Sequence, residues 1–281
     1  ILYESDTLYA IKGDFFEVKF NRKNGMLSSY SINNKELIKA PVRFNFRRAL
    51  TDNDRGWKVG EKMKIWQDAG LHYTVQQFHI TSSDKDKTVI KGEYAFTDSK
   101  ATAIIEHTVF ANGTIEIEYN ISIPLNLPNI PRIGLQFEIE KELQNIDWYG
   151  RGPHENYIDR ESGAAIGIYQ TTLNQWITPY VRPQENSNRG GIRWLRFSQG
   201  THQLQFSAVG EPFCASAWPY TISTLEQTTH DFELKMHNNI IVDIDCNQMG
   251  VGGDCSWGLP VLQKYQIKPG KYQYKFIISA K

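Results

Sequence analysis

Cysteine is scarce in this chain of 281 residues, and neither sign of charge is in excess. The three cysteines, Cys214, Cys246 and Cys255, are too few and too scattered for a disulfide framework, although one bridge stays open, and none forms a zinc-type Cys-x-x-Cys pair. Because 31 basic side chains balance 31 acidic ones, the chain lacks the broad positive field that attracts nucleic acids or anionic membranes. We therefore expect no nucleic acid or membrane partner, but an uncharged or locally recognised one.

Long hydrophobic runs are also missing. No apolar run approaches the ~18 residues of a membrane span, and the opening residues ILYESDTLYAIKGD lack the charged start and apolar centre of a signal peptide. The sequence does not begin with Met. We expect a piece of a longer protein whose targeting segment lies in the missing part, which leaves the cytoplasm and the periplasm open as compartments.

Several motifs that carry enzyme chemistry are absent. The sequence has no His-x-x-x-His pair, no Gly-x-Ser-x-Gly elbow, no Walker loop and no dinucleotide fingerprint. A calcium loop starting at Asp52 would need glutamate at its twelfth position, where the chain has Met63. His154, beside Glu155, and His107, in a strand, could serve acid–base work, but both are more typical of surface or core histidines. We expect no metal site and no cofactor in this chain.

What the sequence does contain is a hydrophobic period of two. From Thr114 to Ile123, isoleucine and tyrosine alternate with polar residues, which predicts a strand with one buried and one wet face. The preceding run Ala103 to Phe110, followed by Asn112-Gly113, predicts a hairpin with a two-residue turn whose first position takes positive φ. Similar runs predict strands at Phe15 to Phe20, Tyr73 to Ile80, Thr88 to Phe96, Arg132 to Glu140, Ile192 to Ser198, Gln203 to Ala208, Asp231 to Met236, Ile240 to Cys246 and Tyr272 to Ile278.

Helical periodicity is confined to two short stretches. Apolar residues recur at helical spacing between Val59 and Ala69, and a turn of helix is expected at Thr221 to Gln227. The turn-rich stretch from Gly150 to Gly191 is expected to form surface loops at one edge. Since no repeat or linker divides the chain, we predict an all-β fold with little helix, a large antiparallel β-sandwich forming one domain over residues 1–281.

Carboxylates in loops are the candidates for catalysis. Hydrolysis of a glycoside usually needs two of them, about 5 Å apart for retention of configuration and further apart for inversion. The loop carboxylates are Asp52, Asp54, Glu155, Asp159, Glu161, Glu185 and Asp254. A loop carboxylate more often caps a turn or pairs with an arginine, so a structural turn is favoured for the segment Arg47 to Trp57.

Near the C-terminus the sequence GVGGDCSWGLP, from Gly250 to Pro260, sets Trp257 among four glycines. Glycine accepts positive φ and close approach of other groups to the backbone, so this stretch predicts a shaped loop. Its tryptophan either fills a hole in the core or offers its ring face to a flat, partly apolar ligand such as a sugar. The local sequence leaves both readings open.

Five segments, taken in order, carry a resemblance to a known family. They are Gly25 to Ser29 (GMLSS), Arg48 to Asp54 (RALTDND), Trp148 to Arg160 (WYGRGPHENYIDR), Tyr180 to Asn186 (YVRPQEN) and Met249 to Trp257 (MGVGGDCSW). Over nearly the whole length, the chain resembles the C-terminal, small-chain domain of β-galactosidases of glycoside hydrolase family two. The resemblance implies a galactose-mutarotase-like supersandwich.

The resemblance also implies where the chemistry lies. The acid/base and nucleophile glutamates, with Mg²⁺ and monovalent cation sites, would belong to an upstream barrel of the same chain, so no catalytic residue is expected here and this part alone is expected to be inactive. Trp257 matches the tryptophan that completes the sugar site of the neighbouring domain, with Gly252, Gly253, Asp254 and Ser256 supporting its loop. The implied substrate is a β-galactoside with terminal non-reducing β-D-galactose, and the full-length protein is expected to be a homo-oligomer.

Some assignments stay open at this point. Asp52, Asn53, Asp54, His154 and Glu155 are assigned either to the ligand side or to a structural loop. The family often has a second acidic residue at the position of Cys255, and no His and Glu pair of the mutarotase superfamily aligns with this sequence. The alternatives are a stand-alone aldose epimerase-like enzyme and a non-catalytic carbohydrate-binding or structural module.

Overall fold

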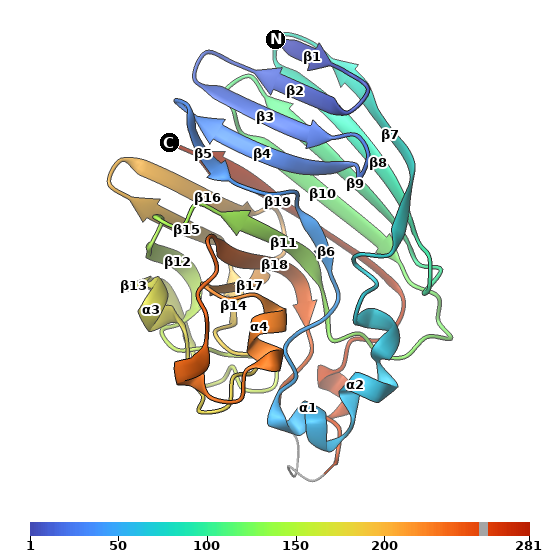
Figure 1. The fold of residues 1–281 in the computed structure, drawn as a ribbon, viewed down its shortest axis with the longest axis vertical. Helices are drawn as coiled ribbons and strands as arrows, with labels where there is room; N and C mark the ends of the chain where they lie inside the picture. Colours follow the sequence, from blue (N-terminus) through green and yellow to red (C-terminus); the bar gives the residue numbers. More distant parts are fainter. Residues whose placement is uncertain (253–257) are drawn as a thin grey trace.

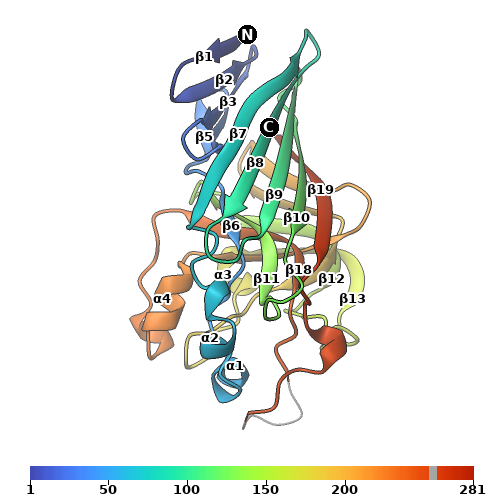
Figure 2. The same ribbon diagram turned by 90° about the vertical axis from the view of Figure 1, so that its right-hand side faces the viewer.

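The computed structural model describes residues 1–252 and 258–281, and these residues form two antiparallel β-sheets packed face to face (Figures 1 and 2). Helices in the described part are few and short. None of them is long and apolar enough to cross a membrane. The predicted all-β sandwich with little helix is confirmed.

The first sheet runs in the order β1-β2-β3-β4-β5-β11-β18-β17-β14, with β6 also paired to β11. Its strands are β1 (Leu2–Glu4), β2 (Leu8–Lys12), β3 (Phe16–Asn21), β4 (Met26–Ile32), β5 (Lys35–Ile38), β6 (Arg43–Asn45), β11 (Arg132–Ile139), β14 (Arg189–Ile192), β17 (Phe213–Trp218) and β18 (Ile240–Gln248). Long crossovers therefore bring strands from the first 45 residues into one sheet with strands from residue 132 onward.

The second sheet runs in the order β13-β12-β15-β16-β19-β10-β9-β8-β7. Its strands are β7 (Tyr73–Ser83), β8 (Lys87–Phe96), β9 (Thr102–Phe110), β10 (Ile115–Ser122), β12 (Asn145–Gly152), β13 (Ala165–Thr172), β15 (Trp194–Gln199), β16 (His202–Ala208) and β19 (Lys271–Ala280). The helices are α1 (Asp52–Gly56), α2 (Val59–Lys62), α3 (Leu173–Trp176) and α4 (Ile222–Gln227), with 3₁₀ turns at Lys64–Trp66, Asp231–Glu233 and Gln263–Tyr265.

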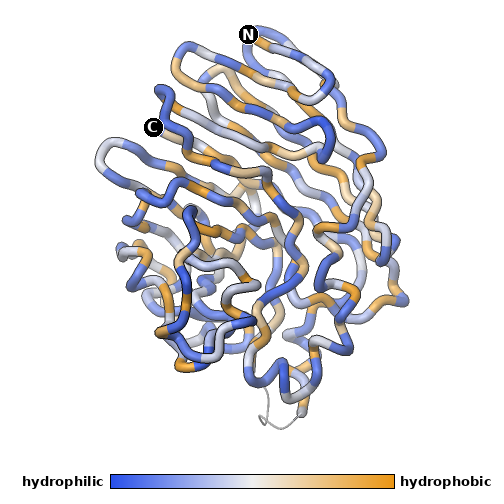
Figure 3. The backbone as a smooth tube through the Cα atoms, in the orientation of Figure 1, coloured by the Kyte–Doolittle hydropathy of each residue, from blue (hydrophilic) through white to orange (hydrophobic). Residues whose placement is uncertain are grey.

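The core lies between the two sheets and is filled by alternate residues of the strands. In β10, Ile115, Ile117, Tyr119 and Ile121 are buried, and most of the residues between them are only partly buried. The same alternation of hydrophobic and hydrophilic residues is visible along many strands in Figure 3. Burying one such aliphatic side chain stabilises the fold by about 1.5 to 3 kcal/mol, so the period of two read from the sequence supplies the main driving force for the sandwich.

The hairpin before β10 is present, but its turn differs from the prediction. Phe110 N–H donates to the Thr114 carbonyl (2.8 Å), which encloses three residues instead of two. The positive φ of +80° belongs to Gly113, and Asn112 instead accepts a hydrogen bond from Thr114 N–H (3.0 Å) through its side chain. Glycine at the last position of a three-residue hairpin loop is a common solution, so the predicted positive φ at Asn112 was wrong.

One further prediction is confirmed in part, and another was wrong where the apolar pattern is short. The stretch Val59 to Ala69 is helical in two pieces, because Met63 leaves the helical region with φ of −116° and separates α2 from the 3₁₀ turn that follows. Residues 231–236 form no strand: they hold a 3₁₀ turn, and Phe232 and Met236 stay exposed. The other predicted strands are present with shifts of about three residues at most, and α4 begins at the predicted place, capped by Thr221.

The stretch from Gly150 to Gly191 was predicted as surface loops, and this is only partly correct. It contains strand β13 and helix α3, and it includes the end of β12 and the start of β14. The loops between these elements carry residues 153–160 and 180–186 to the end of the molecule where α1 lies. These loops form the region described next.

Candidate functional site

Segments that the sequence singles out meet at one end of the molecule. The chain after β6 leads through Arg48 into α1, which Figure 1 shows at the lower end, below both sheets. Residues 249–252, which follow β18, hydrogen-bond to Arg48. The loops 153–160 and 180–186 complete the group through bonds to Gly252 and to α1. Parts of the chain about 200 residues apart therefore build one region.

The backbone of residues 249–252, which we call the clamped segment, is held by side chains from elsewhere. Arg48 donates from Nη1 to the Met249 carbonyl (2.6 Å) and from Nη2 to the Gly250 carbonyl (2.8 Å). The N–H of Gly250 donates to the Tyr265 carbonyl (3.0 Å). Hydrogen bonds from a charged donor are stronger than neutral ones, so the guanidinium of Arg48 fixes the start of the segment.

The end of the clamped segment is fixed by two further side chains. Asn53 donates from Nδ2 to the Val251 carbonyl (2.8 Å), and the N–H of Gly252 donates to Oδ2 of Asp159 (2.6 Å). A Cβ at Gly250 would lie 2.6 Å from both Cγ and Oδ2 of Asp159. The carboxylate therefore sits where only glycine leaves room for it, which explains one glycine of the sequence motif.

The guanidinium of Arg48 is paired with Asp54 inside the protein. Its Nε and Nη2 donate to the two carboxylate oxygens of Asp54 at 2.9 and 2.8 Å, and both side chains are buried. Burial opposes the charge of Arg48, but Asp54 outweighs it and raises the pKa of Arg48 above its ordinary value. Asp54 also accepts from Thr51 N–H and closes the capping box of α1. Of the two roles left open for Asp54, its contacts are those of a structural residue.

Glu155 and His154 lie in different surroundings although they are neighbours in sequence. Glu155 is buried and accepts from Arg160 and the Tyr180 hydroxyl on Oε1, and from Ser187 N–H (2.7 Å) on Oε2. Both of its oxygens are thus engaged by the protein. His154 is exposed. The two residues do not form an acid–base pair in this arrangement.

A hollow of about 310 Å³ opens beside the clamped segment, and we call it the polar hollow. The residues that line it include Asp52, Asn53, Tyr180, Gln184, Glu185 and Gly252. At its rim Asp52 N–H donates to Gln184 Oε1 (3.1 Å), and Gln184 Nε2 donates back to Asp52 Oδ2 (3.1 Å). Carboxylate, amide and hydroxyl groups around one small space suit a ligand rich in hydroxyl groups.

Glu185 also belongs to a buried charge cluster built on Arg132. The guanidinium lies 3.1 Å from Glu185 Oε1, 2.7 Å from Asp243 Oδ2 and 3.0 Å from Asp245 Oδ2, and all four side chains are fully buried. Burial raises the pKa of each of the three carboxyls above its ordinary value, most strongly that of Asp245, although Arg132 opposes the shift. The cluster ties β11, β18 and the loop 180–186 together beneath the polar hollow.

Sequence reasoning missed Arg132, Asp243 and Asp245. One signal was available: the two aspartates alternate within the otherwise apolar run IIVDIDC of β18. A charged residue at every second position of such a strand indicates that the second face is also covered and that the charges find partners there. Arg132 carries no comparable signal, since it begins a strand and its partners lie 53 to 113 residues away along the chain.

The remaining candidate residues are distributed as follows. Glu161 pairs with Arg151 (3.0 Å) at the surface. Burial lowers the pKa of His107 to about 3, and its ring packs against Phe20 inside the sandwich. Histidine–carboxylate contacts in the described chain are His72–Asp98, His230–Glu233 and His237–Glu138, none of which line the polar hollow. Across residues 1–252 and 258–281, no group of three or more His, Cys, Asp or Glu side chains is placed to hold a metal ion.

Part of the sequence motif lies outside the described residues, namely Gly253, Asp254, Cys255, Ser256 and Trp257. The residues on either side of it are held near α1. Gly252 is fixed through Asp159, and a Cβ at Gly258, whose φ is +125°, would lie 3.3 Å from the Gly56 carbonyl oxygen.

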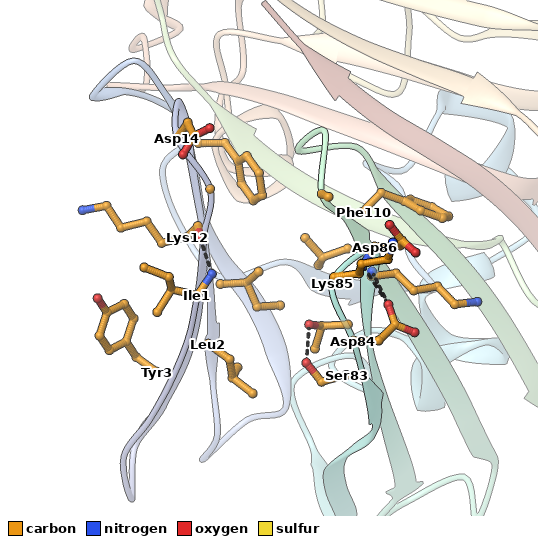
Figure 4. Close-up of a pocket in the computed structure, with 17 residues that line it drawn as sticks. Ile1, Leu2, Tyr3, Lys12, Asp14, Ser83, Asp84, Lys85, Asp86 and Phe110 are labelled. Carbon is orange, nitrogen blue, oxygen red and sulfur yellow. Dashed lines mark hydrogen bonds between the residues drawn. The ribbon is translucent and has the colours of Figure 1, made fainter.

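A second hollow, of about 470 Å³, lies where the two sheets separate near the N-terminus (Figure 4). The amino group of Ile1 donates to the Lys12 carbonyl there (2.7 Å), and Asp84 accepts from the N–H groups of Asp86 and Lys87 within its own turn. The polar groups of this hollow thus serve local strand and turn structure. None of the residues that the sequence assigns to a site lies in it.

Comparison with known proteins gives a family match. The model of the family described as beta galactosidase small chain matches residues 12–278. A β-galactosidase of Priestia megaterium is 33% identical over 265 residues, which cover 94% of this chain and 25% of that protein. A β-galactosidase of Streptococcus thermophilus is 32% identical over 278 residues, which cover 98% of this chain and 27% of that protein. The chain therefore spans about a quarter of the length of these relatives.

Solved structures resemble the fold at low sequence identity. The galactose 1-epimerase of Lactobacillus acidophilus NCFM superposes with a TM-score of 0.58 at 9% identity, covering 100% of this chain and 97% of that one. A candidate aldose 1-epimerase of Escherichia coli K12 gives a TM-score of 0.53 at 10% identity, covering 98% and 99%. The expected galactose-mutarotase-like sandwich is confirmed as the fold.

Proposed function

Because the chain belongs to the beta galactosidase small chain family, we propose that it is the C-terminal domain of a β-galactosidase of the glycoside hydrolase family two type. The whole protein hydrolyses β-galactosides and releases terminal non-reducing β-D-galactose. Residues 1–281 act as one supersandwich domain and are inactive alone. The acid/base and nucleophile glutamates and the cation sites lie on an upstream barrel of the same chain, which agrees with the quarter of the relatives' length that this chain spans.

The role proposed for this domain is to hold Trp257 against the sugar bound on the barrel. The clamped segment is the observation that carries this proposal. The backbone immediately before residues 253–257 is fixed by Arg48, Asn53 and Asp159. A binding group that starts from a fixed base loses less conformational freedom when the ligand arrives, so a rigid clamp favours a loop that presents an aromatic ring.

Trp257 suits a galactoside by the shape of the sugar. β-Galactose has an axial O4, so several of its C–H groups gather on one face that an aromatic ring can cover. Burying roughly 40 to 60 Å² of apolar surface at ~25 cal/mol per Å² contributes about 1 to 1.5 kcal/mol. This corresponds to an effect on affinity of roughly tenfold.

The experiment is the Trp257→Ala substitution in the full-length protein, assayed with a chromogenic galactoside. We expect KM to rise about tenfold or more, because the ring contributes to binding of the sugar. Phe232→Ala is the matched control, since Phe232 is an aromatic residue that is 83% exposed and does not line the polar hollow. An unchanged KM for the tryptophan variant would remove the proposed platform.

The epimerase alternative makes a different prediction. The solved epimerases share the fold, and the histidine–carboxylate contacts of the described residues lie outside the polar hollow. We therefore expect no interconversion of sugar anomers by the purified chain above the rate in buffer. Measurable mutarotation would favour the epimerase reading, and full-length protein that binds galactosides without cleaving them would favour a binding module.

A further inference from the structure

The two sheets of the described chain end in four edge strands, and three of them are protected against pairing with another strand. The outer strands are β1 and β14 in the first sheet and β7 and β13 in the second. β1 has three residues, β14 has four residues with a register shift, and β7 is interrupted by two register shifts. Short or irregular edges prevent a sheet from growing by addition of a further strand.

Strand β13 has none of these protections. It has eight residues, AIGIYQTT, without a charge or a proline, and it pairs with β12 in unbroken register from Ala165 to Thr172. Ile166 is 48% exposed and Ile168 is 69% exposed. Both views of the fold show β13 at the margin of its sheet (Figures 1 and 2). A regular, uncharged, apolar edge of this length is a site for pairing with another strand.

The ladder shows which backbone groups are available for pairing. Immediately after β13, Leu173 N–H donates to the Gln144 carbonyl (2.9 Å), in the register of the β12–β13 pair. Hydrogen-bonded pairs alternate along an antiparallel ladder. Counting back in steps of two from Leu173, residues 171, 169, 167 and 165 bond to β12, so the N–H and C=O groups of the residues between them, Ile166, Ile168 and Gln170, point away from β12.

We propose that β13 pairs antiparallel with β13 of a second copy of this chain, about a two-fold axis at Ile168. Ile168 then faces its own counterpart, and Ile166 faces Gln170 of the other copy. Three outward N–H groups from each copy give about six backbone hydrogen bonds across the junction. The second sheets of two molecules become one continuous sheet, and the exposed edge is removed from both.

The outer face of the sheet beside β13 favours a second copy. Tyr149 of β12 lies opposite Ile168, and Trp194 of β15 lies opposite Tyr149. This row of three residues runs to the edge at the proposed axis. A two-fold axis there joins the row to its equivalent and extends one apolar band across both molecules.

Two of the three arginines near this edge are paired with a carboxylate. Arg196 is paired with Asp147 (3.1 Å) and Arg151 with Glu161 (3.0 Å), whereas the guanidinium of Arg193 lies over the ring of Tyr149, 5.4 Å from its centroid. The chain as a whole has no formal net charge. Two copies therefore approach without long-range repulsion, and β13 itself brings no charge into the junction that would need a partner of opposite sign.

The test is the number of copies of the full-length protein in solution, measured by light scattering after gel filtration over a range of concentrations. We expect the wild type to contain an even number of copies. Ile168→Lys sets two like charges opposite each other at the axis and should raise the dissociation constant of the β13 junction about tenfold, so that the number of copies halves at a concentration about ten times higher than for the wild type. Gln170→Pro should act in the same direction, because it removes an outward N–H and leaves the groups that face β12 in place.

The control is His79→Lys on the edge strand β7, where His79 is exposed. This variant should keep the wild-type number of copies. Each of the three variants should also unfold at the wild-type temperature when it is compared with wild-type protein that has the same number of copies. A monomeric wild type at tens of micromolar would overturn the proposal, as would an Ile168→Lys variant with an unchanged number of copies. Slow amide exchange at Ile166 to Gln170 in a monomer would also overturn it, since another part of the protein would then cover β13.

Discussion

Replacing Gly250 by alanine tests whether the close approach of the Asp159 carboxylate to position 250 holds the clamped segment in place. A Cβ at position 250 would lie 2.6 Å from Cγ and Oδ2 of Asp159, a separation that real Cβ atoms essentially never show. The carboxylate of Asp159 must therefore turn away. It then loses the hydrogen bond that Oδ2 accepts from the N–H of Gly252 (2.6 Å). Gly163 is the matched control, because nothing lies within 4 Å of its Cβ position.

The magnitude follows from the bond that is lost. A hydrogen bond to a charged group contributes about 1.5 to 3 kcal/mol, and the alanine returns about 0.4 to 1 kcal/mol by restricting the unfolded chain. We expect Gly250→Ala to lower the free energy of unfolding by about 1 to 2 kcal/mol. At about 2 to 4 °C per kcal/mol for a domain approaching this size, the unfolding temperature falls by about 2 to 8 °C, whereas that of Gly163→Ala stays level or rises slightly.

The assay is differential scanning calorimetry on Gly250→Ala, Asp159→Ala, the double variant and Gly163→Ala. In the Asp159→Ala background no carboxylate occupies the space that the new Cβ needs, so adding Gly250→Ala should cost almost nothing. A Gly250→Ala protein as stable as the Gly163→Ala control would refute the close contact. If the losses in free energy of unfolding of Gly250→Ala and Asp159→Ala simply add in the double variant, the coupling between the two residues is refuted.

Two further predictions concern the buried charges. Arg48→Met leaves Asp54 buried without its partner, so the free energy of unfolding, measured by urea denaturation, should fall by about 3 to 5 kcal/mol; a loss below about 1 kcal/mol would contradict the pairing. Burial raises the pKa of Asp245 well above its ordinary value, so above about pH 4 this carboxyl holds its proton more firmly in the folded chain than in the unfolded one, and its contribution to the free energy of unfolding falls as pH rises. Asp245→Asn needs no proton and should lose less stability between pH 5 and pH 8, whereas parallel curves for variant and wild type would contradict the shift.

Most strands that were predicted correctly from the sequence have an apolar face that is also the buried face. β10 is such a strand, since its isoleucines point into the core. β13 was missed because its isoleucines, Ile166 and Ile168, point outward, while Gly167 faces inward. The opposite error occurred at residues 231–236, where apolar residues alternate but stay at the surface. An alternation of apolar and polar residues shows that a segment would have an apolar face. It predicts a strand correctly only where that face is buried.

The sequence singled out segments of the candidate site one by one, but it predicted neither that they meet nor how they are bonded. Residues 48–54, 153–160, 180–186 and 249–252 meet at one end of the molecule, and Asn53 contacts the clamped segment directly. The sequence could not show that Glu155 and Asp54 are engaged by arginines and backbone N–H groups, because a carboxylate in a loop looks the same whether it is free or bonded. The Arg132 cluster was missed for a similar reason, since its partners meet only after the sheet has formed.

The proposed role of Trp257 places its indole over the C–H face of galactose bound elsewhere on the protein. The most direct measurement is a structure of the full-length protein with a slowly hydrolysed galactoside. The expected result is a set of indole carbons within about 4 Å of the sugar carbons, with Arg48, Asn53 and Asp159 still holding residues 249–252. An indole that contacts only protein atoms while the sugar binds elsewhere would contradict the proposal.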